Sequence, residues 1–423
     1  MIDYVVIQWI IISLMVLSYL ADHLLDELNR RHFPALVPEA LRDVYSEEKL
    51  SEAREYYNTN LRISRIEEIL SLLITLALLL SGTFGWLDGQ IGRVVNNPVL
   101  QSLLFFTVVL LAASVFQLPF SWYHTFRIEE RFGFNRTTPR TFFLDRLKSL
   151  MLTVLIGGPL MYLVIIIYQA AGKNFWLLVW GVITLFSLFM TLFYSNLIVP
   201  LFNRQTPLPE GELREAIYEL SERLKFGIKD IYLIDGSKRS TKANAYFTGL
   251  GPKKRIVLYD TLVNEYSQDE ILAVMAHEIG HYRYKHTARG LLAGILQTGI
   301  MLFLLSLFIS PESPLALPLC QAVGGPLVQT PSFHLGLLGF GILYEPVSIL
   351  LSLIFNALSR RFEYQADAFA ARWGLGSSLI SALKKLSATH LSNPDPHPWY
   401  AALHYSHPTL LERIRGIRKS MQS

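Results

Sequence analysis

Seven long apolar runs constrain this chain more than any other feature of its sequence. Each is close to the roughly 20 residues that a helix needs to cross a bilayer core of about 30 Å. Only the last run contains a charged side chain, Glu345, which is a functional candidate because ionisable groups are rare at membrane depth. We therefore predict a mainly α polytopic membrane protein with seven transmembrane helices. The runs cover residues 4–21, 69–87, 99–122, 149–171, 175–199, 290–309 and 335–357.

Composition excludes several other classes of protein. Only 17% of the residues are charged and 51% are hydrophobic, whereas soluble domains have about 25% charged residues. Cys320 is the single cysteine, so the chain forms no internal disulfide and no thiolate metal site. Any metal must therefore be bound by histidine and carboxylate. The net charge of +4 is too small to indicate nucleic-acid binding, and we expect none.

The distribution of lysine and arginine predicts the orientation in the membrane. Seven basic residues lie between runs one and two, and six lie between runs three and four. The connections on the opposite side contain only Arg93 and Lys173. Because basic loops remain in the cytoplasm, we expect the N-terminus outside and residues 200–289 and 358–423 in the cytoplasm. Depending on the source, the membrane is the bacterial inner membrane or that of the endoplasmic reticulum.

The runs also suggest a division of the chain. Five helices are expected in 1–199, a polar folded segment in 200–289, two helices in 290–357 and a second polar segment in 358–423. The pattern of the first polar segment predicts one helix and three short strands, whereas 310–333 is rich in Pro and Gly and indicates an irregular connection. The helix is expected near 210–225 and the strands at 230–235, 243–249 and 254–260.

A helix is predicted to follow Ser267, because Glu270 three residues later completes a capping-box pattern. This helix contains His277, Glu278 and His281, an H-E-x-x-H motif. Histidines four residues apart share one helix face, so both can bind one Zn²⁺ while the glutamate lies beside a metal-bound water as general base. Without further ligands, the same pattern is also compatible with two surface histidines.

A catalytic zinc site needs a third protein ligand. Downstream of the seventh run, Glu363 and Asp367 are four residues apart in a helical pattern. Glu363 would complete a His₂Glu site, and Asp367 would accept a hydrogen bond from the outer nitrogen of a ligand histidine. The alternative is an ordinary amphipathic helix with exposed acids.

Beyond these motifs, the chain resembles the type I CAAX prenyl protease family of integral-membrane zinc metallopeptidases. The resemblance covers nearly the whole chain, in order. It rests on FRIEERFGFNRTTP (126–139), LFNRQTPLPEGEL (201–213), DGSKRSTKANAYFTG (235–249), KRIVLYDTLV (254–263), AHEIGH (276–281), RRFEYQADAFA (360–370) and HYSHPTLLERI (404–414).

The resemblance implies a zincin-like metallopeptidase domain with a small β-sheet and one Zn²⁺ per chain. Its ligands would be His277, His281 and Glu363, with Glu278 as catalytic base and Asp367 behind the ligands. It also implies that the helices enclose a large wet chamber into which the zinc faces.

The resemblance further assigns His407 and Arg413 to the scissile carbonyl and its developing oxyanion. From the residues alone, Pro408 suggests a helix start that would put His407 at the positive end of a helix carrying Arg413. A capping or packing histidine is the alternative for His407. Arg413 is equally compatible with an ion pair that ties the C-terminal segment to the domain.

The implied substrate contact is the segment Asn244, Ala245 and Tyr246, as an edge strand against which an extended peptide pairs. A buried structural strand is the alternative. Two further histidines, His286 and His390, are interpreted as surface or packing residues.

By resemblance the substrate is a prenylated protein or peptide from which the C-terminal CAAX tripeptide is removed, at the lipid bilayer. A general quality-control endopeptidase for membrane proteins is one alternative. A site-2-type intramembrane protease would have its motif inside an apolar run, whereas Arg283 and Lys285 follow the motif here. A non-catalytic scaffold or chaperone would lack a ligand or the base, and all four residues are present. The sequence does not indicate an oligomeric state.

Overall fold

A computed structural model describes residues 3–228, 230–248 and 255–422, and within them the chain is mainly helical with one small sheet. This confirms the predicted fold class. The helices are α1 Tyr4–His32, α2 Glu47–Leu80, α3 Thr83–Val94, α4 Pro98–Tyr123, α5 Pro139–Leu152, α6 Gly158–Ala171, α7 Phe175–Leu197, α8 Val199–Phe202, α9 Glu212–Arg223, α10 Asp260–Glu265, α11 Gln268–Arg283, α12 His286–Ile309, α13 Ala316–Gly324, α14 Phe333–Leu343, α15 Glu345–Ala370, α16 Gly376–Thr389, α17 Pro398–His404 and α18 Leu410–Met421. The strands are β1 Gln205–Pro207, β2 Asp230–Ile234, β3 Ala245–Thr248 and β4 Arg255–Tyr259. Short 3₁₀ segments are η1 Glu39–Leu41, η4 Gly172–Asn174 and η5 Gly236–Lys238, and π-helical segments are η2 His124–Glu129, η3 Thr153–Gly157 and η6 Ala371–Leu375.

Long apolar helices make up most of the molecule. Among the described residues, four helical stretches are long and apolar enough to cross a membrane, or up to six if each of two bent pairs is one span. One stretch, Pro139–Phe202, contains both the 149–171 and the 175–199 runs, on either side of η4. The seven predicted spans are compatible with this count, and the number seven itself stays a prediction.

Two of the predicted spans are bent. Between α2 and α3 the direction changes by 62°, next to Gly82, whose φ of 67° is a left-handed conformation. Between α14 and α15 it changes by 55°. Pro346 lies in the first turn of α15, where it provides no backbone N–H to continue the preceding helix. Glu345 is the first residue of α15 and lines a cavity of about 600 Å³ together with residues of α1, α2 and α4.

The prediction of an irregular connection at 310–333 is wrong, because this segment contains the buried helix α13. Its small residues allow close packing against α3: the Cα of Gly85 would lie 3.0 Å from a Cβ placed on Gly324. Leu319, Cys320 and Val323 are buried in the same apolar core as α1 and α14. The Pro and Gly residues therefore punctuate a short helix and do not prevent one.

The sheet has the strand order β1-β2-β4-β3. The central pair β2 and β4 is parallel, and β1 and β3 flank it in antiparallel pairs. The three predicted strands are present as β2, β3 and β4, although the predicted ends at 249 and 254 lie outside the described residues. The three-residue strand β1 was not predicted. In this order β3 is at the edge of the sheet.

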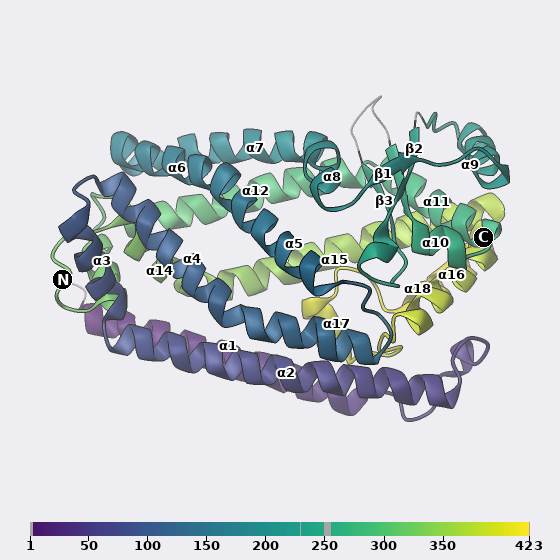
Figure 1. The fold of residues 1–423 in the computed structure, drawn as a ribbon, viewed down its shortest axis with the longest axis horizontal. Helices are drawn as coiled ribbons and strands as arrows, with labels where there is room; N and C mark the ends of the chain where they lie inside the picture. Colours follow the sequence, from purple (N-terminus) through teal and green to yellow (C-terminus); the bar gives the residue numbers. More distant parts are fainter. Residues whose placement is uncertain (1–2, 229, 249–254, 423) are drawn as a thin grey trace.

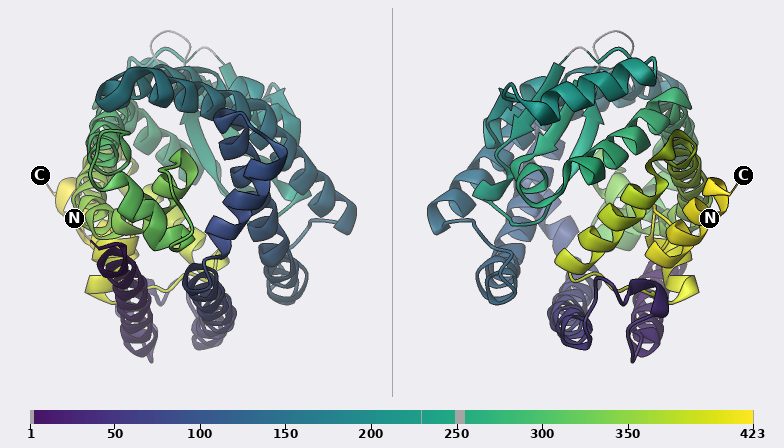
Figure 2. Two further views of the ribbon diagram at one scale, coloured as in Figure 1. Left: turned by 90° about the vertical axis from the view of Figure 1, so that its left-hand side faces the viewer. Right: turned by 90° about the vertical axis from the view of Figure 1, so that its right-hand side faces the viewer.

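The two polar segments share one buried core. It contains side chains from α9, the sheet and α11, together with Phe369, Leu379 and Ile417 from the C-terminal segment. Figure 1 shows these elements gathered at the end of the long axis where the C-terminus lies, opposite the N-terminus. Viewed along that axis, α1 and α2 (purple) lie on the opposite side of the molecule from α6 and α7 (teal) (Figure 2).

Candidate active site

The site lies where α11 packs against α15. The predicted capping box is present: Ser267 Oγ accepts from the Glu270 backbone N–H, and the Glu270 carboxylate accepts from that of Ser267. Gly280 allows the two helices to approach closely, since a Cβ there would lie 3.0 Å from the Cα of Ala366. The histidines of one helix therefore face the carboxylates of the other.

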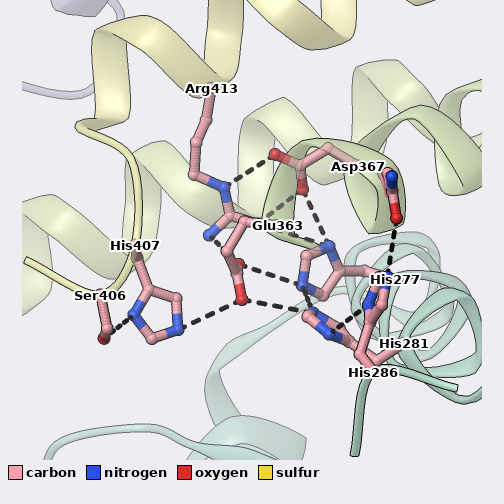
Figure 3. Close-up of polar contacts among 9 residues, drawn as sticks. His277, His281, His286, Glu363, Asp367, Ser406, His407 and Arg413 are labelled. Carbon is pink, nitrogen blue, oxygen red and sulfur yellow. Dashed lines mark hydrogen bonds and ion pairs between the residues drawn. The ribbon is translucent and has the colours of Figure 1, made fainter. Parts of the chain in front are cut away.

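His277, His281 and Glu363 form a group whose ligand atoms all lie within 4.8 Å of one another. The two Nε2 atoms are 3.0 Å apart (Figure 3). Glu363 Oε2 is 3.5 Å from Nε2 of His277, and Glu363 Oε1 is 3.3 Å from Nε2 of His281. His277 and Glu363 are buried, with relative exposures of 7% and 5%. The four-residue spacing thus brings both imidazoles to one carboxylate from a distant segment.

The chemistry of this group fits a metal cation. Asp367 Oδ1 lies 2.8 Å from Nδ1 of His277, so Nδ1 donates to Asp367 and Nε2 is directed at Glu363. The Oε2 atom of Glu363 is buried and has no hydrogen-bond partner among the described residues. A buried carboxylate that faces two imidazole nitrogens is costly unless a cation, whether a proton or a metal ion, lies between them.

Asp367 connects the group to the C-terminal helix. Arg413 donates to it twice, from Nε to Oδ2 at 2.9 Å and from Nη2 to Oδ1 at 2.6 Å. Arg413 Nη1 is also 3.6 Å from Glu363 Oε2. Asp367 therefore contacts the nitrogen of His277 that faces away from Glu363, and its predicted role behind a metal ligand stays a prediction. Arg413 thus forms an ion pair that connects the C-terminal segment to α15, which is one of the two interpretations of this residue from the sequence. It also lies beside Glu363.

These charges determine the protonation of the site. Burial alone lowers the pKa of His277, but the carboxylates of Asp367 and Glu363 overcome it and raise the pKa to about 9. Burial likewise lowers the pKa of Arg413, and Asp367, Glu363 and then Glu278 raise it, for a net increase. Glu278 is half-buried on α11, next to His277 in sequence. The environment therefore favours positive charge at the point where the ligand atoms meet.

His407 faces the group from the loop before α18, with Nε2 3.4 Å from Glu363 Oε1, and its side chain is 63% exposed. The prediction that Pro408 starts the helix is wrong. Thr409 is the N-cap, in a capping box with Glu412, and α18 begins at Leu410. His407 therefore reaches the site from a loop, and the helix N-terminus lies further along the chain.

Asn244, Ala245 and Tyr246 lie at the start of the edge strand β3, which α11 contacts. The Tyr259 N–H donates to the Asn244 carbonyl, so these two residues form a hydrogen-bonded pair of the antiparallel ladder. Since such pairs alternate, the N–H and C=O of Ala245 point away from β4. The Asn244 side chain accepts the Ala245 N–H at 2.8 Å. At the outer edge, the Ala245 N–H is therefore capped by the Asn244 side chain, and an added strand would pair with this N–H only after that side chain turns away.

Sequence reasoning missed the contact of His286 with the site. His286 is buried, as a packing residue would be, but its Nδ1 also lies 3.1 Å from Nδ1 of His281. Its Nε2 lies 2.9 Å from the Gln365 amide oxygen. Lys285, with φ 57°, reverses the chain between α11 and α12 and returns His286 to His281. A left-handed lysine has no reliable sequence signal, so the spacing of five residues did not indicate this contact.

Fold and site together define a membrane-integral metallopeptidase. Residues 207–421 match the model of peptidase family M48, and residues 28–204 match a model described as CAAX prenyl protease N-terminal, five membrane helices. The chain belongs to this family.

Relatives of similar length support the assignment. The chain is 36% identical over 421 residues to CAAX prenyl protease 1 homolog of Arabidopsis thaliana, with 96% of each chain covered. It is 34% identical over 400 residues to CAAX prenyl protease 1 of Saccharomyces cerevisiae, with 90% of this chain and 88% of the relative covered. The crystal structure of S. mikatae Ste24p superposes with a TM-score of 0.89 at 33% identity, covering 99% of both chains.

Proposed function

We propose that this metallopeptidase is a zinc endopeptidase that removes the C-terminal tripeptide of prenylated CAAX proteins or peptides. The observation that carries the proposal is the convergence of His277, His281 and Glu363, with Glu278 next to the first ligand. Two imidazoles and one carboxylate leave a fourth tetrahedral position open, as catalytic zinc sites require. The names of the relatives supply the substrate class.

In this proposal each residue has a defined role. Zinc, when bound, would polarise the peptide carbonyl and acidify a water molecule. Glu278 accepts the proton of the attacking water and passes it to the leaving amine. His407 donates from the open side of the site to the developing oxyanion. Arg413, with two nitrogens already held by Asp367, contributes mainly through its positive charge and through the position of Asp367.

The substrate is proposed to bind as an added strand on β3. Ala245 would offer its outward C=O to the peptide, and also its N–H once the Asn244 side chain, which now accepts it, turns away. Asn244 and Tyr246 would lie on either side. Main-chain pairing holds an extended peptide in one register and makes little demand on side chains. This suits a C-terminal tripeptide of variable sequence.

We further propose that residues 200–289 and 358–423 form one catalytic unit on the cytoplasmic side, with the N-terminus outside. Their shared apolar core supports the first part. The basic loops between the first and second, and the third and fourth, apolar runs support the second. The membrane spans would then deliver lipid-anchored substrates to the site from the bilayer.

The test uses the purified full-length protein in detergent and a pair of matched C-a-a-X peptides, one farnesylated and one unmodified. The wild type is expected to contain about one zinc per chain and to cleave the farnesylated peptide. Glu278→Gln should retain the zinc and lose cleavage by about 10²- to 10⁴-fold, because the general base is lost. Asp269→Gln, at an exposed acid of the same helix, is the control and should cleave normally.

The outcomes separate the alternatives. Equal cleavage of both peptides indicates a general membrane endopeptidase without prenyl specificity. A full zinc content with no cleavage of either peptide indicates a non-catalytic scaffold. Normal turnover by Glu278→Gln would overturn the assignment of the base.

A further inference from the structure

The outer nitrogen of His281 contacts another histidine, whereas that of His277 contacts a carboxylate. His281 Nδ1 is 3.1 Å from Nδ1 of His286 (Figure 3). Nε2 of His286 is 2.9 Å from Oε1 of Gln365. These three side chains form a continuous path of hydrogen bonds from the surface to a proposed zinc ligand. Any role for this path rests on the proposed function, since it concerns the same metal site.

The direction of the path follows from proton counting. An amide oxygen only accepts, so the His286 proton facing Gln365 is on Nε2. A neutral imidazole carries one such proton, which leaves Nδ1 of His286 as an acceptor. His281 must then donate from its own Nδ1, and its Nε2 presents a lone pair to the site. The opposite direction would put a proton on His281 Nε2, where the metal would bind.

We propose that Gln365 and His286 are positioning residues that fix the tautomer of His281 for metal binding. Gln365 sets the direction of the hydrogen bonds, and His286 transmits it to the ligand. Metal ligands usually require an outer partner of this kind, and such partners contribute about 10- to 100-fold to metal affinity.

The surroundings of His286 hold its ring in place for this role. Its ring stacks on Phe362, with centroids 4.2 Å apart and an interplanar angle of 12°. Tyr284 stacks on it as well, at 5.7 Å and 24°. The residue is only 4% exposed. Because the ring plane is fixed, both nitrogens stay directed at their partners, and only the position of the proton remains to be set.

The two ligand histidines therefore have different supports. His277 is held by Asp367, whose charge is matched by Arg413, whereas His281 is held by neutral groups. The neutral path adds no charge, so Glu363 is the negative group at the ligand atoms. This arrangement preserves more of the positive charge of a bound dication than a second carboxylate would.

The first experiment changes the direction of the path at the exposed end. Full-length Gln365→Met and Gln365→Glu are purified in detergent, and the zinc dissociation constant is measured by competition with a chelator. Glutamate keeps an acceptor for His286, so we expect an affinity close to that of the wild type. Methionine removes this acceptor, so that the protein no longer fixes the tautomers of His286 and His281. We therefore expect about tenfold weaker zinc binding, the lower end of the usual range.

The second experiment separates the hydrogen bond from packing at His286. His286→Phe keeps a stacked ring without an acceptor and should weaken zinc binding by about 10- to 100-fold. His286→Asn places an amide oxygen near the position of Nδ1 and should recover most of the affinity. The absorption spectrum of bound Co²⁺ is expected to change in the Phe variant and to return in the Asn variant.

The thermal unfolding midpoint of each metal-free variant shows whether it is folded. The proposed role of the hydrogen-bond path is overturned if Gln365→Met and His286→Phe both keep the zinc affinity and the Co²⁺ spectrum of the wild type, and the proposed function then remains intact. Absence of zinc binding in the wild type would overturn both the proposed metal site and the role of the path. These experiments measure metal binding only, and the peptidase assignment is tested by the cleavage of the matched peptides.

Discussion

Two histidines show how the environment of a single residue determines its charge. His277 lies between carboxylates, and its pKa is raised to about 9. His390 lies at the end of α16, where burial and then the positive charge of Lys242 lower its pKa to about 4, although Glu129 acts in the opposite direction. Its Nε2 is buried without a partner among the described residues. His277 thus favours a cation at its position, and His390 opposes one.

His390 makes the protein sensitive to acid. Its folded pKa lies below the value of about 6.5 expected in the unfolded chain, so between pH 6.5 and 4 the unfolded state binds more protons. Stability therefore falls as the pH falls through this range, by about 2 kcal/mol at pH 5. His390→Leu, which cannot be protonated, should show a smaller loss of apparent unfolding midpoint between pH 7 and 5. Identical pH profiles for the two proteins would contradict this account.

At the scale of elements, the edge strand β3 has two kinds of backbone position. Ala245 points its N–H outward, whereas Tyr246 faces Val257 in the next hydrogen-bonded pair of the ladder with β4. Proline at an outward position of an edge strand is tolerated by the sheet. At an inward position it removes a ladder hydrogen bond. The two positions allow substrate pairing to be tested apart from folding.

We expect Ala245→Pro to keep its unfolding midpoint and its zinc content and to lose about tenfold or more in kcat/KM, since the peptide loses a main-chain partner and meets the ring. Tyr246→Pro, the matched variant, should instead be destabilised by about 1–3 kcal/mol, because its partner in the ladder loses a hydrogen bond. Cleavage rates and thermal midpoints of both variants decide the matter. If Ala245→Pro cleaves normally, the substrate does not pair at this edge.

The contact between α3 and α13 depends on two glycines. A Cβ on Gly85 would overlap the backbone carbonyl of Gly324, and neither helix can shift without disturbing the surrounding core. Gly85→Ala should therefore lower stability by about 1–3 kcal/mol or more. Gly89→Ala, one turn later with no atom within 4 Å, should be neutral or slightly stabilising. Thermal midpoints of the two variants provide the comparison, and equal values would show that α13 yields to the added methyl.

The elements that sequence reasoning identified are those determined by local patterns. The capping box at Ser267 and the apolar runs depend on neighbouring residues, and they predicted α11 and the membrane helices. The helix α13 and the strand β1 were missed because tertiary packing decides them: α13 is a Pro- and Gly-containing segment buried by its neighbours, and β1 has only three residues. The hydrogen-bond path through His286 depends on a chain reversal at Lys285, which no sequence pattern predicts. Asp367 was anticipated from helical spacing, but the two hydrogen bonds from Arg413 require the complete fold.

At the scale of the whole molecule, the positions of the N-terminus and of the site along the long axis predict the orientation of the protein in the membrane. The N-terminus and the α3–α4 connection lie at one end of the long axis, and the site lies near the other (Figure 1). If the basic loops remain in the cytoplasm, as proposed above, we expect the end with the site to be the cytoplasmic one. Substrates and products that stay in the cytoplasm would then reach the metal without crossing the bilayer.

Cysteine labelling tests this orientation with little background, because the single native cysteine, Cys320, is buried. Asn96→Cys places a thiol in the α3–α4 connection, and Glu210→Cys places one before α9 at a side chain that is 96% exposed. In spheroplasts of a bacterial expression host, a membrane-impermeant maleimide should label Asn96→Cys at once. It should label Glu210→Cys only after lysis, since the positive-inside rule keeps that segment in the cytoplasm. The reverse pattern would place the catalytic segment outside, and the basic loops would then have crossed the membrane against the usual charge preference.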